Sequence, residues 1–116
     1  MRIYLRIILL TLLSIVVPVL QGAARPPSEV IVEKNAEVGG LHIEVKHVSR
    51  NIRKHFIRHM YVYINDSEIK SFSYPAQKSP PGFSEDIQVE TQSGDVVRVE
   101  TVCNESGKDT YTVTLP

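Results

Sequence analysis

The side chains best suited to chemistry in this chain are one cysteine, Cys103, and four histidines at positions 42, 47, 55 and 59. A thiolate and neutral imidazoles form a sensible donor set for a transition metal, because they can hold such an ion against water. A lone thiol has two other uses, as an intermolecular disulfide partner or as a small buried apolar group. The sequence therefore offers a metal site as one of three interpretations of Cys103.

The spacing of the histidines limits which of them can share an ion. His55 and His59 fall on one face of a predicted strand, and four residues of extended chain separate them by roughly 13 Å. One ion cannot bind both unless the strand bulges. His59 is therefore interpreted as a half-exposed sheet histidine, whereas His55 is either a ligand or a hydrogen-bonded edge residue. The sequence contains no Ser-His-Asp arrangement with supporting motifs and no glycine-rich phosphate loop.

The elements that must position these residues are short strands. Leu41, Ile43 and Val45 alternate with polar residues, which is the period of a half-buried strand. The segment 96–102 is rich in β-branched residues, which strands favour. The remaining predicted strands cover 30–33, 56–64, 69–74, 83–90 and 110–115. Turn residues separate these seven segments and no long helical period follows residue 24, so the pattern predicts an all-β, immunoglobulin-like antiparallel β-sandwich.

For the strand 56–64, the sequence also predicts which side chains share each face of the sheet. Phe56, Met60, Val62 and Ile64 are expected to share one face and to pack together. Ile57 is expected on the opposite face, with the histidines and tyrosines of the same segment.

The first 24 residues have the features of a secretory signal peptide. Two arginines precede an apolar run over 7–20, and small residues lead up to a cleavage position after Ala24. An uncleaved anchor helix is the alternative, but the run is short for a bilayer span and contains Pro18. We predict cleavage, export to the periplasm or beyond the cell, and one mature domain over 25–116 that is no longer attached to the membrane.

The charge of the mature chain is nearly balanced. The whole sequence holds 13 Lys and Arg against 13 Asp and Glu, and loss of Arg2 and Arg6 would leave 11 against 13. No basic stripe follows the chain, which argues against nucleic acid as a partner.

Two segments carry a resemblance to a known family. His55-Phe56-Ile57 opens an apolar strand, and Cys103-Asn104-Glu105-Ser106-Gly107 matches a Cys-Asn-x-His-Gly motif at three of its four defined positions. Together they resemble the iron-binding domain of the desulfoferrodoxin family, the superoxide reductases. The resemblance implies an iron site in which Cys103 is the axial thiolate and His55 an equatorial ligand. His47, in the neighbouring loop, is the best candidate for a further ligand.

The chain also departs from this family, which holds its iron with four histidines and one cysteine. Ser106 stands where the motif has a histidine, and Asn35 stands where a Glu-Lys-His motif has another. The loop before residue 55 lacks the family's His-Pro pair. The resemblance therefore implies a superoxide reductase-like fold with an incomplete iron site and weak or no catalysis. An electron donor or another partner protein is the expected partner.

A second family resembles other parts of the same chain. The small immunoglobulin-like subunit of the thiosulfate-oxidising sulfur carrier shares the His-Phe-Ile strand opening. It is also similar over Ser79-Pro80-Pro81-Gly82-Phe83 and over 94–99. This resemblance implies a structural partner without a catalytic metal. The Cys-Asn-x-x-Gly ending and the chain's own export signal favour the first family.

Overall fold

The computed structural model describes residues 28–116 apart from positions 36 and 38, so the predicted signal peptide lies outside the described residues. The described part contains seven strands, and it has no helix that is long and apolar enough to cross a membrane. The strands are β1 (Ser28–Asn35), β2 (Gly40–His47), β3 (Ile57–Ile64), β4 (Ser67–Ser73), β5 (Gly82–Gln88), β6 (Val96–Cys103) and β7 (Gly107–Thr114).

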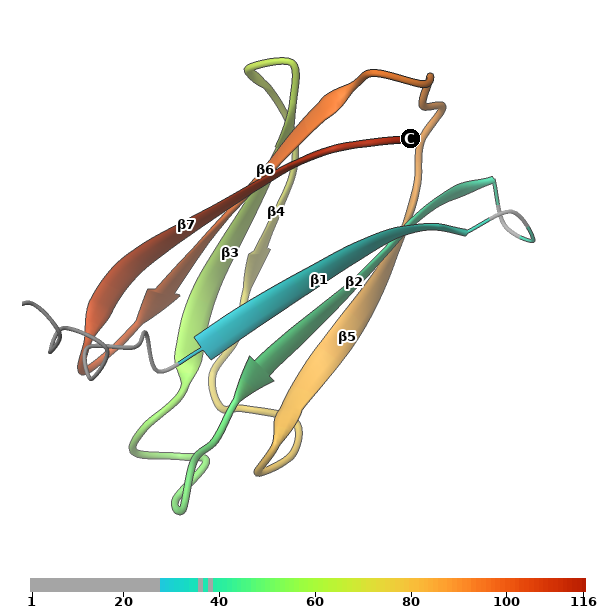
Figure 1. Ribbon diagram of the computed structural model, residues 1–116. Coiled ribbons are helices and arrows are strands. Elements are labelled where there is room, and N and C mark those ends of the chain that lie inside the picture. The colour runs from blue at the N-terminus through green and yellow to red at the C-terminus, as the bar shows by residue number, and fades with distance from the viewer. Residues whose placement is uncertain (1–27, 36, 38) are drawn as a thin grey trace, which may run out of the picture.

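These strands form two antiparallel sheets, shown in Figure 1. One sheet has the order β1-β2-β5 and the other has the order β4-β3-β6-β7. The arrangement confirms the predicted all-β sandwich. Three strands differ most from the expected bounds: β1 pairs with β2 from Ser28 to Asn35, β5 ends at Gln88, and β7 already begins at Gly107.

The core lies between the sheets and follows the alternation in the sequence. Leu41, Ile43 and Val45 point inward from β2, with exposed fractions of 0%, 0% and 1%. Burial of such a side chain stabilises the fold by about 1.5–3 kcal/mol. The other buried apolar side chains are Ile57, Met60, Val62, Ile87, Val97, Val99, Cys103 and Leu115. Polar side chains occupy the intervening positions of β2. The two-residue period therefore predicted correctly which face of this strand lies inward.

The face prediction for the strand 56–64 was wrong at its beginning. Ile57 is 1% exposed and packs in the core, on the same side as Met60 and Val62. The register with β6 shifts between Ile57 and His59, because Ile57 lies opposite Cys103 while His59 lies opposite Val102. This bulge adds one residue to β3, which reverses the alternation at that point.

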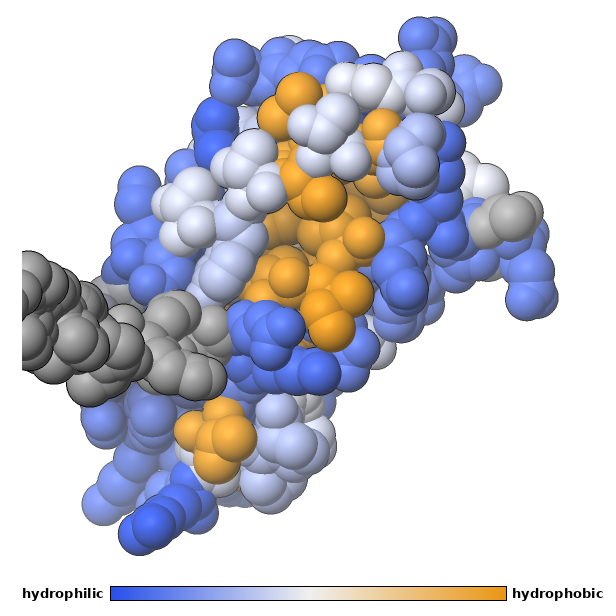
Figure 2. All heavy atoms as spheres, viewed as in Figure 1, coloured by the Kyte–Doolittle hydropathy of each residue, from blue (hydrophilic) through white to orange (hydrophobic). Residues whose placement is uncertain are grey.

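The sandwich has two open sides, each bounded by a pair of edge strands. β1 and β7 are the edges on one side, and β5 and β4 are the edges on the other. Figure 2 shows apolar side chains in the hollow between β1 and β7. Val30 and Val32 line it from β1, and Val113, 38% exposed, lines it from β7.

Candidate metal centre

Three segments that are distant in sequence converge at one end of the sandwich. β2 ends at His47, β3 begins two residues after His55, and β6 ends at Cys103. Because β3 and β6 run antiparallel, the start of one lies against the end of the other, and Ile57 pairs with Cys103. One potential ligand atom from each of His47, His55 and Cys103 lies within 4.8 Å of the other two. The structure thus brings together all three of the predicted site residues.

The three side chains differ in exposure. His47 is 0% exposed and Cys103 is 4% exposed, whereas His55 is half-buried and faces the solvent in part. The two imidazoles meet edge to face, with ring centroids 4.7 Å apart. Nε2 of His47 is buried without a hydrogen-bond partner among the described residues. A buried nitrogen in this state costs free energy, and a bound ion would remove that cost.

Gln77, in the loop between β4 and β5, fixes the ring of His47. The Gln77 side-chain nitrogen donates to the carbonyl oxygens of His47 at 2.6 Å and of Ser79 at 2.8 Å. Its oxygen therefore faces Nδ1 of His47, 2.7 Å away, and Nδ1 must be the protonated nitrogen. The lone pair then resides on Nε2, which is the form that binds a metal. Sequence reasoning missed Gln77, because a glutamine in a proline-rich loop carries no signal of burial.

Asn104 holds the cysteine segment against the residues on both sides of His55. Its side-chain nitrogen donates to the carbonyl oxygen of Lys54 at 2.8 Å, and its side-chain oxygen accepts from the backbone of Phe56 at 3.0 Å. The backbone nitrogen of Asn104 also donates to the carbonyl oxygen of Phe56. These three hydrogen bonds link Asn104 to Lys54 and Phe56, so His55 cannot move far from Cys103 without breaking them.

The turn after β6 places two hydrogen-bonding groups at the sulfur, and as a thiol Cys103 donates to the side-chain oxygen of Asn104 at 3.9 Å. The backbone N–H of Glu105 donates to Sγ of Cys103 at 3.5 Å. A hydrogen bond of this kind orients a sulfur ligand and tunes the ion that it holds. Ser106, which stands at the family's histidine position, is exposed in this turn and is not part of the group of three.

The other two histidines lie on outer faces of the sandwich. His42 on β2 binds Asp86 on β5 through Nδ1 at 2.8 Å, and this hydrogen bond is the main reason that the pKa of Asp86 is lowered. His59 on β3 lies 3.1 Å from the hydroxyl of Ser73 and stacks on Tyr61. The prediction that His55 and His59 do not share an ion is consistent with these positions.

The three donors fit a single metal ion held by one thiolate and two imidazoles. Donor atoms bound to one tetrahedral ion at about 2.0–2.3 Å lie about 3.3–3.8 Å apart. The upper separation here is 4.8 Å, so closure needs a shift of about 1 Å, which rotation of the half-buried His55 side chain can supply. The five-donor iron centre of the superoxide reductases does not fit, because the described histidines other than His47 and His55 point elsewhere.

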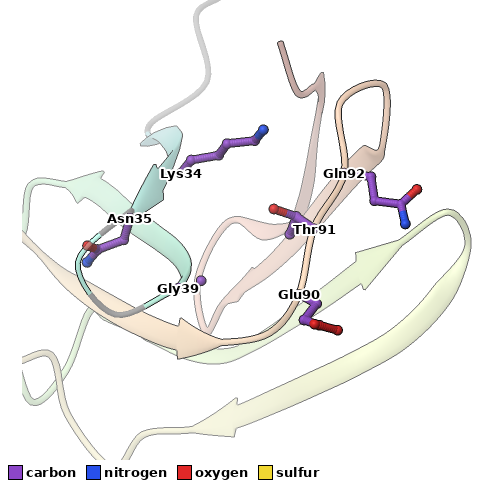
Figure 3. Close-up of a pocket in the computed structure, with 7 residues that line it drawn as sticks. Lys34, Asn35, Gly39, Glu90, Thr91 and Gln92 are labelled. Atoms are coloured by element: carbon purple, nitrogen blue, oxygen red, sulfur yellow. The ribbon is translucent and has the colours of Figure 1, made fainter.

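A hollow lies at the opposite end of the same sheet and is separate from these donors. It encloses about 380 Å³ and is lined by the end of β1, the turn after it and the segment that follows β5, as Figure 3 shows. Asn35 pairs with Gly40 there, whereas His47 pairs with Ser28 at the other end. Seven residues of strand separate the two regions by roughly 23 Å. Lys34 and Glu90, its charged lining residues, are exposed.

Comparison with known proteins supports the fold and goes no further. No family model matches the chain, and no curated protein matches it. Among solved structures the chain is similar to a superoxide reductase (neelaredoxin) from Ignicoccus hospitalis, with a TM-score of 0.53 and 10% sequence identity. The similarity covers 78% of this chain and 79% of that chain. At this identity the likeness shows a shared fold, and the site must be judged on its own residues.

Proposed function

We propose that this protein is an exported metal-binding domain of superoxide reductase-like fold, in which His47, His55 and Cys103 hold one ion. The observation that carries the proposal is that Nε2 of His47 is buried without a hydrogen-bond partner, on a residue that lies in the same cluster as the cysteine sulfur. Its protonated neighbour Nδ1 is committed to Gln77, so the free nitrogen is prepared to bind. A purely structural histidine would be expected to satisfy both nitrogens.

Each residue has a distinct role in this proposal. Cys103 supplies the negative charge and soft sulfur that set the affinity for a transition metal. His47 is the rigid ligand, because Gln77 fixes its ring. His55 is the ligand nearest to solvent and marks the side from which a small oxidant or a partner could approach. We infer export from the signal-like residues 1–24. Small exported domains often rely on disulfides, but the one cysteine of this chain cannot form one internally, which leaves Cys103 available as a ligand.

Iron is the ion that the family resemblance implies, but efficient superoxide reduction is not part of the proposal. Two imidazoles are present where the family uses four, and Ser106 is exposed instead of reaching the cluster. A hydroxyl is a poor replacement for imidazole on iron.

Iron loading tests this reading of the function. The purified protein is loaded with ferrous iron under anaerobic conditions, oxidised, and assayed for a thiolate-to-iron absorption band and for superoxide consumption. We expect a weak or absent band and slow consumption, because too few nitrogens are available. A strong band with rapid superoxide consumption would mean that other groups complete an iron centre and that the protein is an active reductase.

The second candidate function is a partner domain without a catalytic metal. One observation favours it: β5 is an edge strand, and the loop 79–83 that leads into it lines a hollow with Val48, which is 72% exposed. An unpaired edge strand can accept a strand from another protein. Under this function the purified protein would carry no metal, and Cys103→Ser would leave its binding to that partner unchanged.

A further inference from the structure

The donor set of this site points to a different ion from the iron that the family resemblance implies. Among the described residues, the cluster consists of two imidazoles and one cysteine sulfur, and a cysteine binds a metal as the thiolate. Two histidines and one cysteine around a metal form the trigonal ligand set of blue-copper electron-transfer sites. Cuprous copper is soft and prefers sulfur, whereas iron with a single thiolate needs additional nitrogen or oxygen donors.

The burial of the ligands also favours copper over iron. Iron held by three protein donors would need two or three water molecules to complete its usual coordination. His47 is 0% exposed and Cys103 is 4% exposed, so water can approach only beside His55. A low-coordinate ion suits this enclosure better, because three protein donors nearly satisfy it.

Zinc is the strongest competitor, since cysteine and histidine are also its ligands. Zinc takes four ligands in a tetrahedral arrangement, and the described residues here offer three. In its cupric state, copper also binds a given nitrogen and sulfur site more tightly than zinc in the ordering of divalent metals. The comparison therefore favours copper on donor number and on affinity.

We propose that this site takes copper, bound as one ion per chain by Nε2 of His47, an imidazole nitrogen of His55 and the sulfur of Cys103. This inference rests on the proposed metal-binding function and narrows it to one metal. The main support for copper is the donor set. The fold is similar to that of a superoxide reductase, but the three donors match a copper site and do not match the iron centre that the family resemblance implies.

Metal competition tests the inference. Purified protein is incubated anaerobically with equal amounts of cuprous copper, ferrous iron and zinc, and the retained metals are counted by mass spectrometry after gel filtration. We expect one copper per chain and at least a tenfold preference over each of the other two metals. Oxidation of the copper-loaded protein with ferricyanide transfers one electron from Cu(I) to ferricyanide and should produce an intense thiolate-to-Cu(II) band.

The outcomes distinguish the copper inference from the metal-binding function on which it rests. Retention of zinc or iron in place of copper would overturn the copper inference and leave the metal-binding function intact. Retention of no metal would overturn both. Cys103→Ser should remove the band, and His59→Ala, which changes a histidine on an outer face, should leave it unchanged.

A measurement on the wild-type protein covers the case in which the buried variants fail to fold. X-ray absorption at the copper edge should find one sulfur and two nitrogen neighbours. A shell of nitrogen and oxygen alone would show that copper binds outside this cluster.

Discussion

Gln77 binds His47 at two points: its side-chain oxygen lies 2.7 Å from Nδ1, and its side-chain nitrogen lies 2.6 Å from the His47 carbonyl oxygen. The second bond determines the orientation of the amide, and the first determines the tautomer of the imidazole. A residue far from any recognisable motif thus decides which histidine nitrogen is free. The consequence is a buried nitrogen prepared to bind an ion before the ion arrives.

The first prediction concerns this pair. Gln77→Leu should lower the affinity for the metal about 10–100-fold. Loss of the hydrogen bond between Gln77 and Nδ1 would free the His47 ring to rotate and to change tautomer. Isothermal titration or competition with a chelator measures this change. Gln88→Leu removes an exposed glutamine from β5 and serves as the control. Equal affinities in the two variants would show that Gln77 does not position His47.

The second prediction concerns Asn104, whose side chain makes two hydrogen bonds across the site. Asn104→Ala should lower the free energy of unfolding by about 1–3 kcal/mol, at about 0.5–1.5 kcal/mol for each bond lost. It should also weaken metal binding, because His55 is no longer held beside Cys103. Urea unfolding of the metal-free protein and a metal titration measure the two effects separately.

Asn65→Ala is a matched control for that variant. Asn65 also makes two side-chain hydrogen bonds, to Asp95 and to the backbone of Val96, but it lies at the far end of β3. It should lower the stability and leave the metal affinity unchanged. If both variants weaken metal binding equally, general loss of stability would explain the effect of Asn104→Ala.

Sequence patterns predicted most of the fold because the strands are amphipathic. The alternation at Leu41, Ile43 and Val45 predicts an inward face that the structure confirms, and the β-branched run 96–102 predicts the strand β6. The same rule placed Ile57 on the wrong face, because a bulge adds one residue and its position depends on pairing with β6. A sequence pattern contains no information on that pairing.

The candidate site could be predicted only in part. Cys103 and His55 stand in recognisable motifs. His47 was predicted to lie in the neighbouring loop, whereas the structure places it at the buried end of β2. Gln77 and the clamping role of Asn104 depend on contacts between segments 30 and 48–50 residues apart. The contacts of Asn104 arise from the pairing of β3 with β6, and those of Gln77 arise where the loop between β4 and β5 meets the end of β2, so local spacing could not indicate them.

The third prediction concerns alkaline pH and the link between the two sheets at Tyr74. The Tyr74 hydroxyl donates to Glu85 at 2.7 Å, and burial, followed by this bond, raises the pKa of Tyr74 far above its usual 10. Above pH 10 the unfolded chain loses the tyrosine proton while the folded protein keeps it, so the free energy of unfolding should fall as the pH rises. Tyr74→Phe should reduce this decline. An identical decline in the variant would exclude Tyr74 as its source.

The fourth prediction concerns Gly82, at the start of β5 beside the end of β2. A Cβ at this position would lie 2.0 Å from the carbonyl oxygen of Val45, and φ is +141°. Gly94 also has a positive φ, of +91°, but a Cβ there would meet nothing within 4 Å. Gly82→Ala should therefore destabilise the protein by about 1–3 kcal/mol more than Gly94→Ala, because only the former also creates a clash. Equal melting temperatures would contradict this difference.

The metal content of the purified protein tests the central claim most directly. Wild-type protein and the variant His59→Ala should each retain one metal ion per chain after gel filtration, whereas His47→Ala, His55→Ala and Cys103→Ser should each retain less than a tenth as much. Circular dichroism on every variant identifies those that remain folded β-proteins. A wild-type protein that binds no metal, or folded Cys103→Ser and His47→Ala variants that bind as much as the wild type, would contradict the assignment of a thiolate–imidazole metal site.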